Sequence, residues 1–141
     1  MSRAEGFTYF DVAADVGLHG WGMTLEAAFR QIGLGLFALI VEPGSIEERE
    51  SREVRAQGDT PEALLVNWLN DCLYVHDVEG FVARRIAFPV FEEARLHSVL
   101  WGEEVDPGRH RLGTVVKAAT YHQLTIRRAD DGWEIKVILD I

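Results

Sequence analysis

The order of hydrophobic and polar positions predicts a strand and then a helix in the first part of the chain. Residues 7–12 are aromatic and β-branched, which is typical of a short strand. The glycine-rich residues 15–22 would not support a helix, so we expect them to be extended or irregular. Thr24 is a good N-cap for a following helix. The apolar residues of that helix recur with helical spacing at Leu25, Ala28, Phe29, Ile32, Leu36, Leu39 and Ile40.

Two glycines lie inside this first helix. Gly33 and Gly35 each cost about 1 kcal/mol in helix propensity relative to alanine, so we expect the helix to approach a sheet closely there. A Pro-Gly pair at residues 43–44 ends the element. The charged residues 46–57 carry apolar side chains on one parity, which predicts a polar edge strand.

A second helix has a strong start signal. Thr60 is an N-cap, Pro61 takes the first helical position, and Glu62 lies near the positive end of the helix dipole. Because Cys72 lies on the apolar stripe of this helix, we expect a buried, inert thiol. The helix closes at residues 77–80, and its stripe consists of Leu64, Leu65, Trp68, Leu69, Cys72 and Leu73.

The remainder of the chain alternates as strands do. Pro89 ends the first of these strands. In the last strand every second residue is apolar, while Glu134, Lys136 and Asp140 share the polar face. Ile138 is the one apolar residue on that polar face. The expected elements are a hairpin of residues 81–88 and 94–101, a loop at 102–113, one bent strand or two at 114–128, and a final strand at 133–141.

This order of elements predicts an α+β fold. Both helices come early and runs of strands follow, so we expect a mostly antiparallel sheet with the two helices packed on one face. The strand–helix–strand pattern occurs twice, which permits a duplicated unit. No linker interrupts the chain, and we therefore expect residues 1–141 to form a single domain.

Composition and charge narrow the function classes. No apolar run approaches the roughly 20 residues that a membrane-spanning helix needs, and the first residues do not resemble a signal peptide. The single cysteine excludes an internal disulfide, so we expect a cytoplasmic protein. A formal net charge of −9 disfavours non-specific nucleic-acid binding and favours a cation or a basic protein surface as partner. The basic clusters at residues 84–85, 109–111 and 127–128 are interpreted as solvated strand ends and loop tips.

Three acidic residues near the chain ends are candidates for a metal site. Asp11 and Asp15 flank a small apolar step, and Asp140 precedes the final residue, Ile141. If the last strand lies beside the first, the Asp140 carboxylate could approach Asp15. Carboxylate, carbonyl and terminal oxygens suit Ca²⁺, Mg²⁺ or Mn²⁺ rather than Zn²⁺. The alternative is that Asp15 caps a turn and Asp140 is merely solvated.

Other catalytic chemistry has little support. The five histidines form no zinc-type cluster, and the chain has no P-loop, nucleophile elbow or dinucleotide fingerprint. His122 shares strand parity with Leu124 and Ile126, which predicts a packed histidine at the edge of the core. Lys117 stands alone among apolar residues. Either it extends to water, or it lies near a carboxylate–metal centre and contacts phosphate or a partner's acidic group.

Several collinear stretches closely resemble the archease family. The opening run Asp-Val-Ala-Ala-Asp-Val-Gly-Leu-His-Gly-Trp-Gly at residues 11–22 is similar to the start of archeases, and the resemblance continues to Phe29. Together the stretches cover nearly the whole chain in the order of the family, which makes the resemblance specific. The other matching stretches are residues 64–74, 79–81, 101–103, 106–107, 109–110, 116–122 and 137–141.

The resemblance implies a protein cofactor rather than a stand-alone enzyme. Archeases assist the RtcB-type RNA ligase, which joins tRNA halves and other broken RNAs, by promoting guanylylation of its active-site histidine and multiple turnover. The implied fold nests one strand–helix–strand–strand unit inside another. The implied divalent-metal site, with Ca²⁺ as the expected ion, falls on Asp15, Asp140 and Ile141. The implied functional lysine falls on Lys117, and Asp11 is left as a neighbour of the site.

One departure from the family pattern bears on the site. Archeases usually have a histidine and a hydroxyl residue where this chain has Val12 and Ala13. Asp15 is kept, so we expect metal binding to survive, whereas any contact made by the missing histidine would be lost. Two other functions remain open. The protein could be a metal-dependent hydrolase with His122 or Asp11 as its base, or a chaperone-like adaptor whose metal is purely structural.

Overall fold

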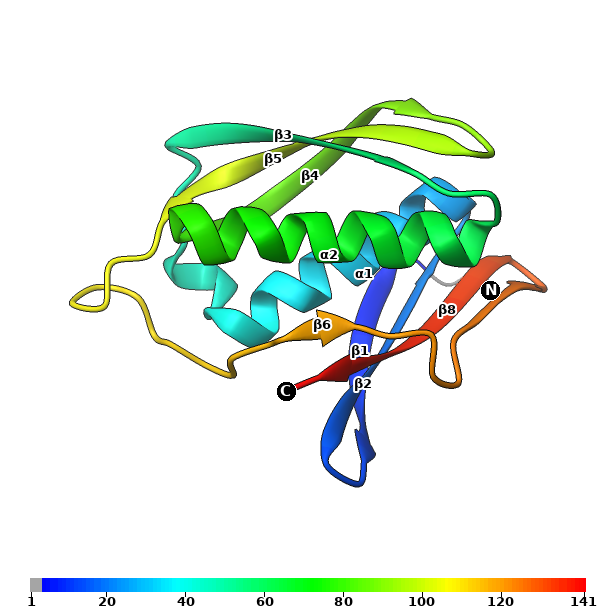
Figure 1. The fold of residues 1–141 in the computed structure, drawn as a ribbon, viewed down its shortest axis with the longest axis horizontal. Helices are drawn as coiled ribbons and strands as arrows, with labels where there is room; N and C mark the ends of the chain where they lie inside the picture. Colours follow the sequence, from blue (N-terminus) through cyan, green and yellow to red (C-terminus); the bar gives the residue numbers. More distant parts are fainter. Residues whose placement is uncertain (1–3) are drawn as a thin grey trace.

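The computed structural model describes residues 4–141, which form two helices and two antiparallel sheets (Figure 1). The helices are α1 (Leu25–Ile40) and α2 (Pro61–Glu79), and a short 3₁₀ turn, η1 (Pro43–Ser45), follows α1. The strands are β1 (Gly6–Val12), β2 (Asp15–Gly22), β3 (Glu50–Gln57), β4 (Phe81–Phe91), β5 (Arg95–Glu104), β6 (Ala118–Ala119), β7 (Thr125–Ala129) and β8 (Gly132–Asp140). One sheet has the order β1-β2-β8-β6, with β7 also paired to β8, and the other has the order β3-β5-β4.

The second sheet is built from the middle of the chain and the first from its two ends. β3, α2, β4 and β5 follow one another as a strand–helix–strand–strand unit. β2, α1, β7 and β8 form a surrounding unit of the same order. The α+β class and the nested arrangement that the resemblance implied are therefore confirmed. The structure adds that the strands divide between two sheets.

Helix α1 lies between the two sheets, and its glycines allow the close approach that the sequence predicted. A Cβ on Gly35 would come within 2.6 Å of Leu18 in β2. On the other side, a Cβ on Gly33 would come within 2.5 Å of Trp68 and 2.8 Å of Ile86 in β4. Alanine in place of either glycine would push the helix away from a sheet.

Both helix starts are confirmed by their caps. The side chain of Thr24 accepts a hydrogen bond from Ala27 N–H at 3.0 Å, and that of Thr60 accepts one from Ala63 N–H at 3.0 Å. The predicted stripe of α2 is buried, and burial raises the pKa of the Cys72 thiol, which fits an inert group. Neither helix within residues 4–141 has the length and hydropathy needed to span a membrane.

Three strand predictions are refined by the structure. Residues 15–22 form a regular strand at the centre of the first sheet rather than an irregular segment. β4 continues through Pro89, because β4 is an edge strand and its register with β5 shifts between Ala87 and Val90. The long β-rich stretch 114–128 contains two short strands, β6 and β7.

Candidate functional site

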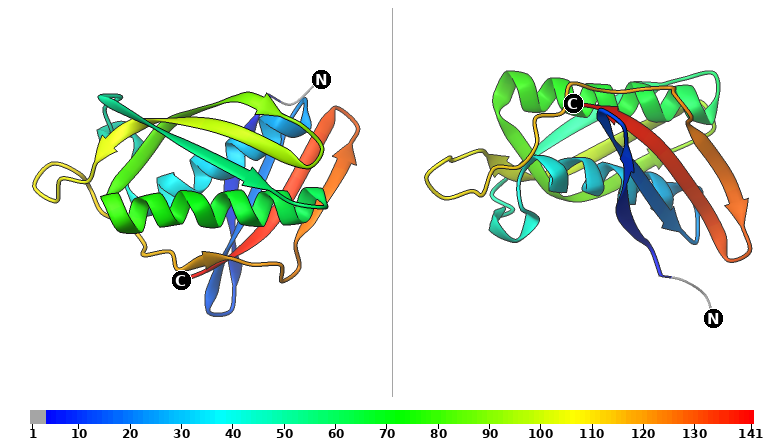
Figure 2. Two further views of the ribbon diagram at one scale, coloured as in Figure 1. Left: turned by 45° about the horizontal axis from the view of Figure 1, so that its top comes forward. Right: turned by 90° about the horizontal axis from the view of Figure 1, so that it is seen from below.

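The residues expected to hold a metal gather at one end of the first sheet, where β1 turns into β2 and β8 ends. Val12 pairs with Asp15 across this turn, and Val16 pairs with Leu139 between β2 and β8. Continuing the second register by one step places Asp15 opposite Asp140. The C-terminus therefore lies at the same end of the sheet as the β1–β2 turn (Figure 2).

Asp15 and Asp140 project from the outer face of this sheet, away from α1. Side chains alternate along a strand, and Leu18, Val137 and Leu139 are fully buried on the face that α1 covers. Asp15 and Asp140 have the opposite parity, so their carboxylates share the outer face. Directly opposed residues of an antiparallel pair have Cα atoms about 5 Å apart, which brings the two carboxylates within reach of one ion.

Asp11 lies on the other face of the sheet. It pairs with Val16, which has the parity of the buried residues, and it stays exposed because β1 is an edge strand. If the strand ran without a turn from Asp11 to Asp15, the two side chains would lie on one face because they are four residues apart. The turn between them reverses the chain, and the two acids point to opposite faces instead.

The segment of residues 105–117, here called the strap, brings Lys117 to the same end of the sheet. The main-chain N–H of Lys117 donates a hydrogen bond of 2.7 Å to the carbonyl of Asp140. Just after the strap, Asn70 of α2 binds both main-chain groups of Ala119. Ala119 N–H donates to Asn70 Oδ1 at 2.8 Å, and Asn70 Nδ2 donates to the Ala119 carbonyl at 3.3 Å. The exposed side chain of Lys117 is thereby held beside the end of β8.

Two carboxylates are fewer ligands than a metal ion needs. Among residues 4–141, no group of three or more His, Cys, Asp and Glu side chains is arranged to hold a metal ion. A third oxygen would come from Ile141, whose partly buried side chain packs against the core and positions its main chain directly after Asp140. This all-oxygen set suits Ca²⁺, Mg²⁺ or Mn²⁺. Such ions take about six or more ligands, so several positions would be left for water or for groups of another molecule.

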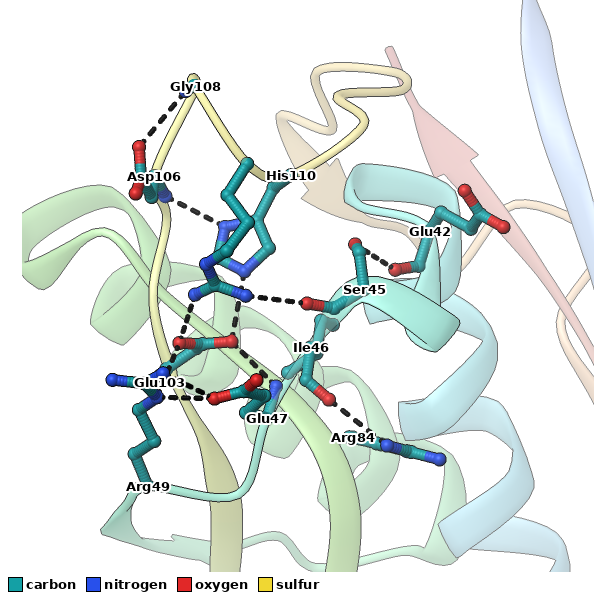
Figure 3. Close-up of polar contacts among 11 residues, drawn as sticks. Glu42, Ser45, Ile46, Glu47, Arg49, Arg84, Glu103, Asp106, Gly108 and His110 are labelled. Carbon is teal, nitrogen blue, oxygen red and sulfur yellow. Dashed lines mark hydrogen bonds and ion pairs between the residues drawn. The ribbon is translucent and has the colours of Figure 1, made fainter.

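A second polar cluster surrounds Glu103 at the end of β5, and its hydrogen-bond network did not follow from the sequence. The side chain of Glu103 is only 5% exposed. Its carboxylate accepts hydrogen bonds from Glu47 N–H at 2.6 Å and from His110 Nε2 at 3.0 Å, and it pairs with Arg109 (Figure 3). Burial would raise the pKa of Glu103, but these hydrogen bonds and the Arg109 charge lower the pKa to about 2. Glu103 is therefore a buried carboxylate that stays ionised at neutral pH.

His110 ties the strap to this carboxylate. Its Nδ1 accepts a hydrogen bond of 2.7 Å from Asp106 N–H, so the ring proton that is donated to Glu103 lies on Nε2. The interpretation of residues 109–111 as a solvated loop tip is wrong for His110, which is buried and bonded to Glu103. Arg109 is exposed in the turn, as expected, and also pairs with the Glu103 carboxylate. The sequence feature that could have indicated this contact is the Asp-Pro-Gly turn that begins at Asp106, because such a turn folds the chain back toward Glu103.

The prediction that His122 is packed at the edge of the core is wrong. His122 is exposed in the turn between β6 and β7. The next residue, Gln123, has a φ of 52°, so the chain reverses at this point and the assumed strand parity does not hold. Leu124 and Ile126 do pack against the core.

Comparison with known proteins identifies relatives along the whole chain. The model of the Archease protein family (MTH1598/TM1083) matches residues 7–141. A protein called Protein archease from Pyrococcus abyssi is 36% identical over 145 residues, covering 100% of each chain. A protein of the same name from Thermococcus gammatolerans is 37% identical over 94% of this chain and 96% of its own. One from Danio rerio is 36% identical over 96% of this chain and 85% of its own.

Two solved structures have the same fold. The solution structure of Methanobacterium thermoautotrophicum protein 1598 superposes with a TM-score of 0.81 at 31% identity, covering 96% of this chain and 99% of that one. A crystal structure from Thermotoga maritima, described as an archease and possible chaperone, superposes with a TM-score of 0.59. It is 21% identical over 94% of each chain, which bears on the fold alone.

Proposed function

The chain belongs to the archease family, and from this premise we propose that it is a protein cofactor of an RtcB-type RNA ligase. In this role it promotes guanylylation of the ligase's active-site histidine and allows multiple turnover in tRNA splicing and RNA repair. It is an activator rather than an enzyme, it works in the cytoplasm, and it meets RNA only through the ligase.

The observation that supports this role is the opposition of Asp15 and Asp140 on the outer face of the sheet, at the end where the chain terminates. The two carboxylates and an oxygen of Ile141 would hold a divalent ion, with Ca²⁺ expected and Mg²⁺ or Mn²⁺ as alternatives. When bound, such an ion neutralises phosphate charge, which guanylyl transfer from a nucleoside triphosphate requires. Because the pair lies at the tip of the sheet, it can approach a site in another protein.

Lys117 adds a positive charge beside this pair. Its main chain is fixed to the Asp140 carbonyl, while its side chain is exposed. A lysine ammonium is a compact charge that contacts phosphate or carboxylate groups. We assign Lys117 the role of contacting the nucleotide phosphates or an acidic group of the ligase, and we keep Asp11 as a neighbouring residue of the site.

The acidic character of the whole protein supports a ligase rather than RNA as its direct partner. A formal net charge of −9 repels a phosphate backbone at long range. An enzyme that binds RNA ends and a nucleoside triphosphate carries a basic surface around its site. The same negative charge that disfavours RNA therefore favours docking to such an enzyme.

Two alternatives are less well supported. A stand-alone hydrolase would need a base beside the ion, but Asp11 lies on the opposite face of the sheet and His122 lies in a surface turn. One observation favours a chaperone-like adaptor with a structural metal: the Thermotoga maritima relative is described as a possible chaperone.

The test is guanylylation of a purified RtcB-type ligase with and without this protein. Asp15→Asn and Asp140→Asn, and a chain extended beyond Ile141, are expected to lose most of the stimulation. Asp131→Asn is the matched control, because Asp131 is an exposed acid in the β7–β8 turn at the far end of the same sheet. Full stimulation by all three site variants would disprove the metal role. A melting shift with Ca²⁺ but unchanged stimulation in these variants would favour the adaptor.

A further inference from the structure

Exposed apolar side chains are concentrated beside the strap. Among the described residues, four of the large hydrophobic side chains that remain exposed belong to the second half of α2 or to the strap. They are Tyr74 (67% exposed), Val78 (63%), Leu112 (55%) and Val115 (79%), here called the α2–strap patch. Scattered exposed hydrophobics are ordinary, but a contiguous group of this kind marks an interaction surface.

The strap is attached to α2 at two points, and Asp77 of α2 lines a hollow together with Leu112 and Val115. Tyr74 and Val78 are helical neighbours of Asp77, which connects the two pairs of exposed residues. Val105 N–H donates a hydrogen bond of 2.8 Å to the carbonyl of Gly80, just beyond the helix end. Ala119 is bound to Asn70 at the other end of the contact. Tyr74 lies one helical turn from Asn70 and therefore falls between the two attachment points.

A hollow of about 320 Å³ lies in the same region. Leu112, Val115 and Val116 of the strap line it together with His76 and Asp77 of α2. Leu112 and Val115 are therefore both exposed and placed on the rim of a concave surface. A hollow with an apolar rim accepts protruding apolar side chains of a partner.

These apolar residues are not needed to fold α2. The buried stripe of the helix faces the second sheet, whereas Tyr74 and Val78 lie one turn apart on the exposed side. Asp71 and Asp77 are exposed on that side too, three residues before and after Tyr74. The patch is therefore apolar at its centre and acidic along its helical border.

The patch is continuous with the carboxylate site. Val115 is two residues from Lys117, about 7 Å along an extended chain, and Lys117 is bonded to Asp140. One partner surface of ordinary size, about 800 Å² on each side, would cover both features. The two together form one footprint rather than two independent sites.

We propose that the α2–strap patch is the surface by which the protein docks onto its ligase, and that the ligase presents apolar side chains flanked by Lys or Arg. This inference rests on the proposed function. The basic flank follows from Asp71 and Asp77 on the border of the patch and from the net charge of −9. Docking at the patch supplies affinity, while Asp15, Asp140 and Lys117 act on the bound ligase.

The experiment measures two quantities for each variant with purified full-length ligase: the Kd for the ligase and the maximal guanylylation rate at saturating protein. Val115→Ser is expected to raise the Kd about tenfold. Val115→Lys and Val78→Lys are expected to raise it further, because they also repel a basic surface. All three should reach the wild-type maximal rate at saturation. Asp15→Asn should behave in the opposite way, with a wild-type Kd and a reduced maximal rate.

Met23→Lys is the matched control. Met23 is 64% exposed, yet it follows β2 at the end of the sheet far from Asp15. Because Val78, Val115 and Met23 are all exposed, the variants should keep the wild-type melting temperature.

The outcomes separate the two claims. Wild-type stimulation with unchanged Kd values in all patch variants would overturn the docking surface and leave the proposed function standing. Binding that depends on the patch without any stimulation by the wild-type protein would support the surface and overturn the activation role. A loss of affinity in Met23→Lys equal to that of Val115→Lys would also overturn the patch.

Discussion

The main-chain N–H of Lys117 donates a hydrogen bond of 2.7 Å to the carbonyl of Asp140, so the strap and the last strand are joined at the proposed site. This bond uses no side-chain atom of either residue. Substitutions of Lys117 therefore change its charge without releasing the strap from β8.

We predict that Lys117→Ala lowers the maximal stimulation of ligase guanylylation about tenfold, the effect of one lost charge contact of about 1.4 kcal/mol. Lys117→Arg should retain part of the stimulation, since it keeps the charge but not the shape. Lys136→Ala is the control, because Lys136 is the only other lysine of the chain and is exposed on β8. Equal losses in Lys117→Ala and Lys136→Ala would show that only net charge matters.

Glu103→Gln is predicted to destabilise the protein by about 2–3 kcal/mol in urea or guanidinium unfolding. The reason is that the three donors that now bind a buried, charged carboxylate would face a neutral amide instead. The neighbouring Glu104 is the control, since its side chain is 65% exposed. Glu104→Gln should change the free energy of unfolding by less than about 0.5 kcal/mol. Similar values for the two variants would contradict a structural role of the Glu103 cluster.

The lowered pKa of Glu103 predicts a specific loss of stability in acid. The folded-state pKa is about 2, against an ordinary value of 4.5, so folding favours the ionised carboxylate. The stabilisation is complete above pH 4.5, declines as the pH falls below that value, and is gone once the pH has passed through about 2. The free energy of unfolding should therefore fall less steeply in this range for Glu103→Gln than for wild type. Parallel curves for the two proteins would count against this linkage.

Much of the fold could be predicted because its signals are local. The caps at Thr24 and Thr60 and the apolar stripe of α2 depend on neighbouring residues, and all were confirmed. Strand partners depend on contacts between residues far apart in the chain. The sequence left open whether β8 lies beside β1, and the structure places it beside β2. The opposition of Asp15 and Asp140 depends on that choice.

The parts of the site that the sequence did not predict depend on the same long-range contacts. The burial of His110 requires Glu103 to face it across a turn, and composition alone made residues 109–111 look like a basic surface cluster. The separation of Asp11 from Asp15 depends on a turn that no glycine marks. Exposed Tyr74 and Val78 could have been noticed as apolar residues outside the stripe of α2, but only the strap beside them makes them a surface.

Gly102→Ala is predicted to destabilise the protein by about 3 kcal/mol, at the upper end of overpacking costs. A Cβ at this position would lie 1.8 Å from the carbonyl oxygen of Val82, which is main chain of the paired strand β4 and cannot move aside as a side chain could. Gly44→Ala is the control, because the nearest atom to its Cβ would be 3.9 Å away. Comparable unfolding free energies for the two variants would contradict the close β4–β5 approach.

The last prediction concerns the stability of the protein with and without metal. Without an ion, the like charges of Asp15 and Asp140 face each other across β2 and β8, a cross-strand arrangement that destabilises by roughly 0.2–1 kcal/mol. Asp15→Asn removes this repulsion, so the variant should melt at a higher temperature than wild type in the presence of a chelator. Added Ca²⁺ should then raise the melting temperature of wild type, because an ion that binds only the folded state stabilises it.

Asp15→Asn should lose most of that Ca²⁺-dependent rise, so that the order of the two melting temperatures reverses as Ca²⁺ is added. Asp131→Asn removes one negative charge from the far end of the sheet. It should change the melting temperature by the same amount in the presence of chelator and of Ca²⁺. The reversal separates a metal site from a mere excess of negative charge. Only if the ion binds the Asp15 carboxylate does the difference in melting temperature between Asp15→Asn and wild type change sign when Ca²⁺ is added. A rise of the same size in wild type and Asp15→Asn would mean that Ca²⁺ binds elsewhere, and the opposed carboxylates would then be a local strain with no ligand.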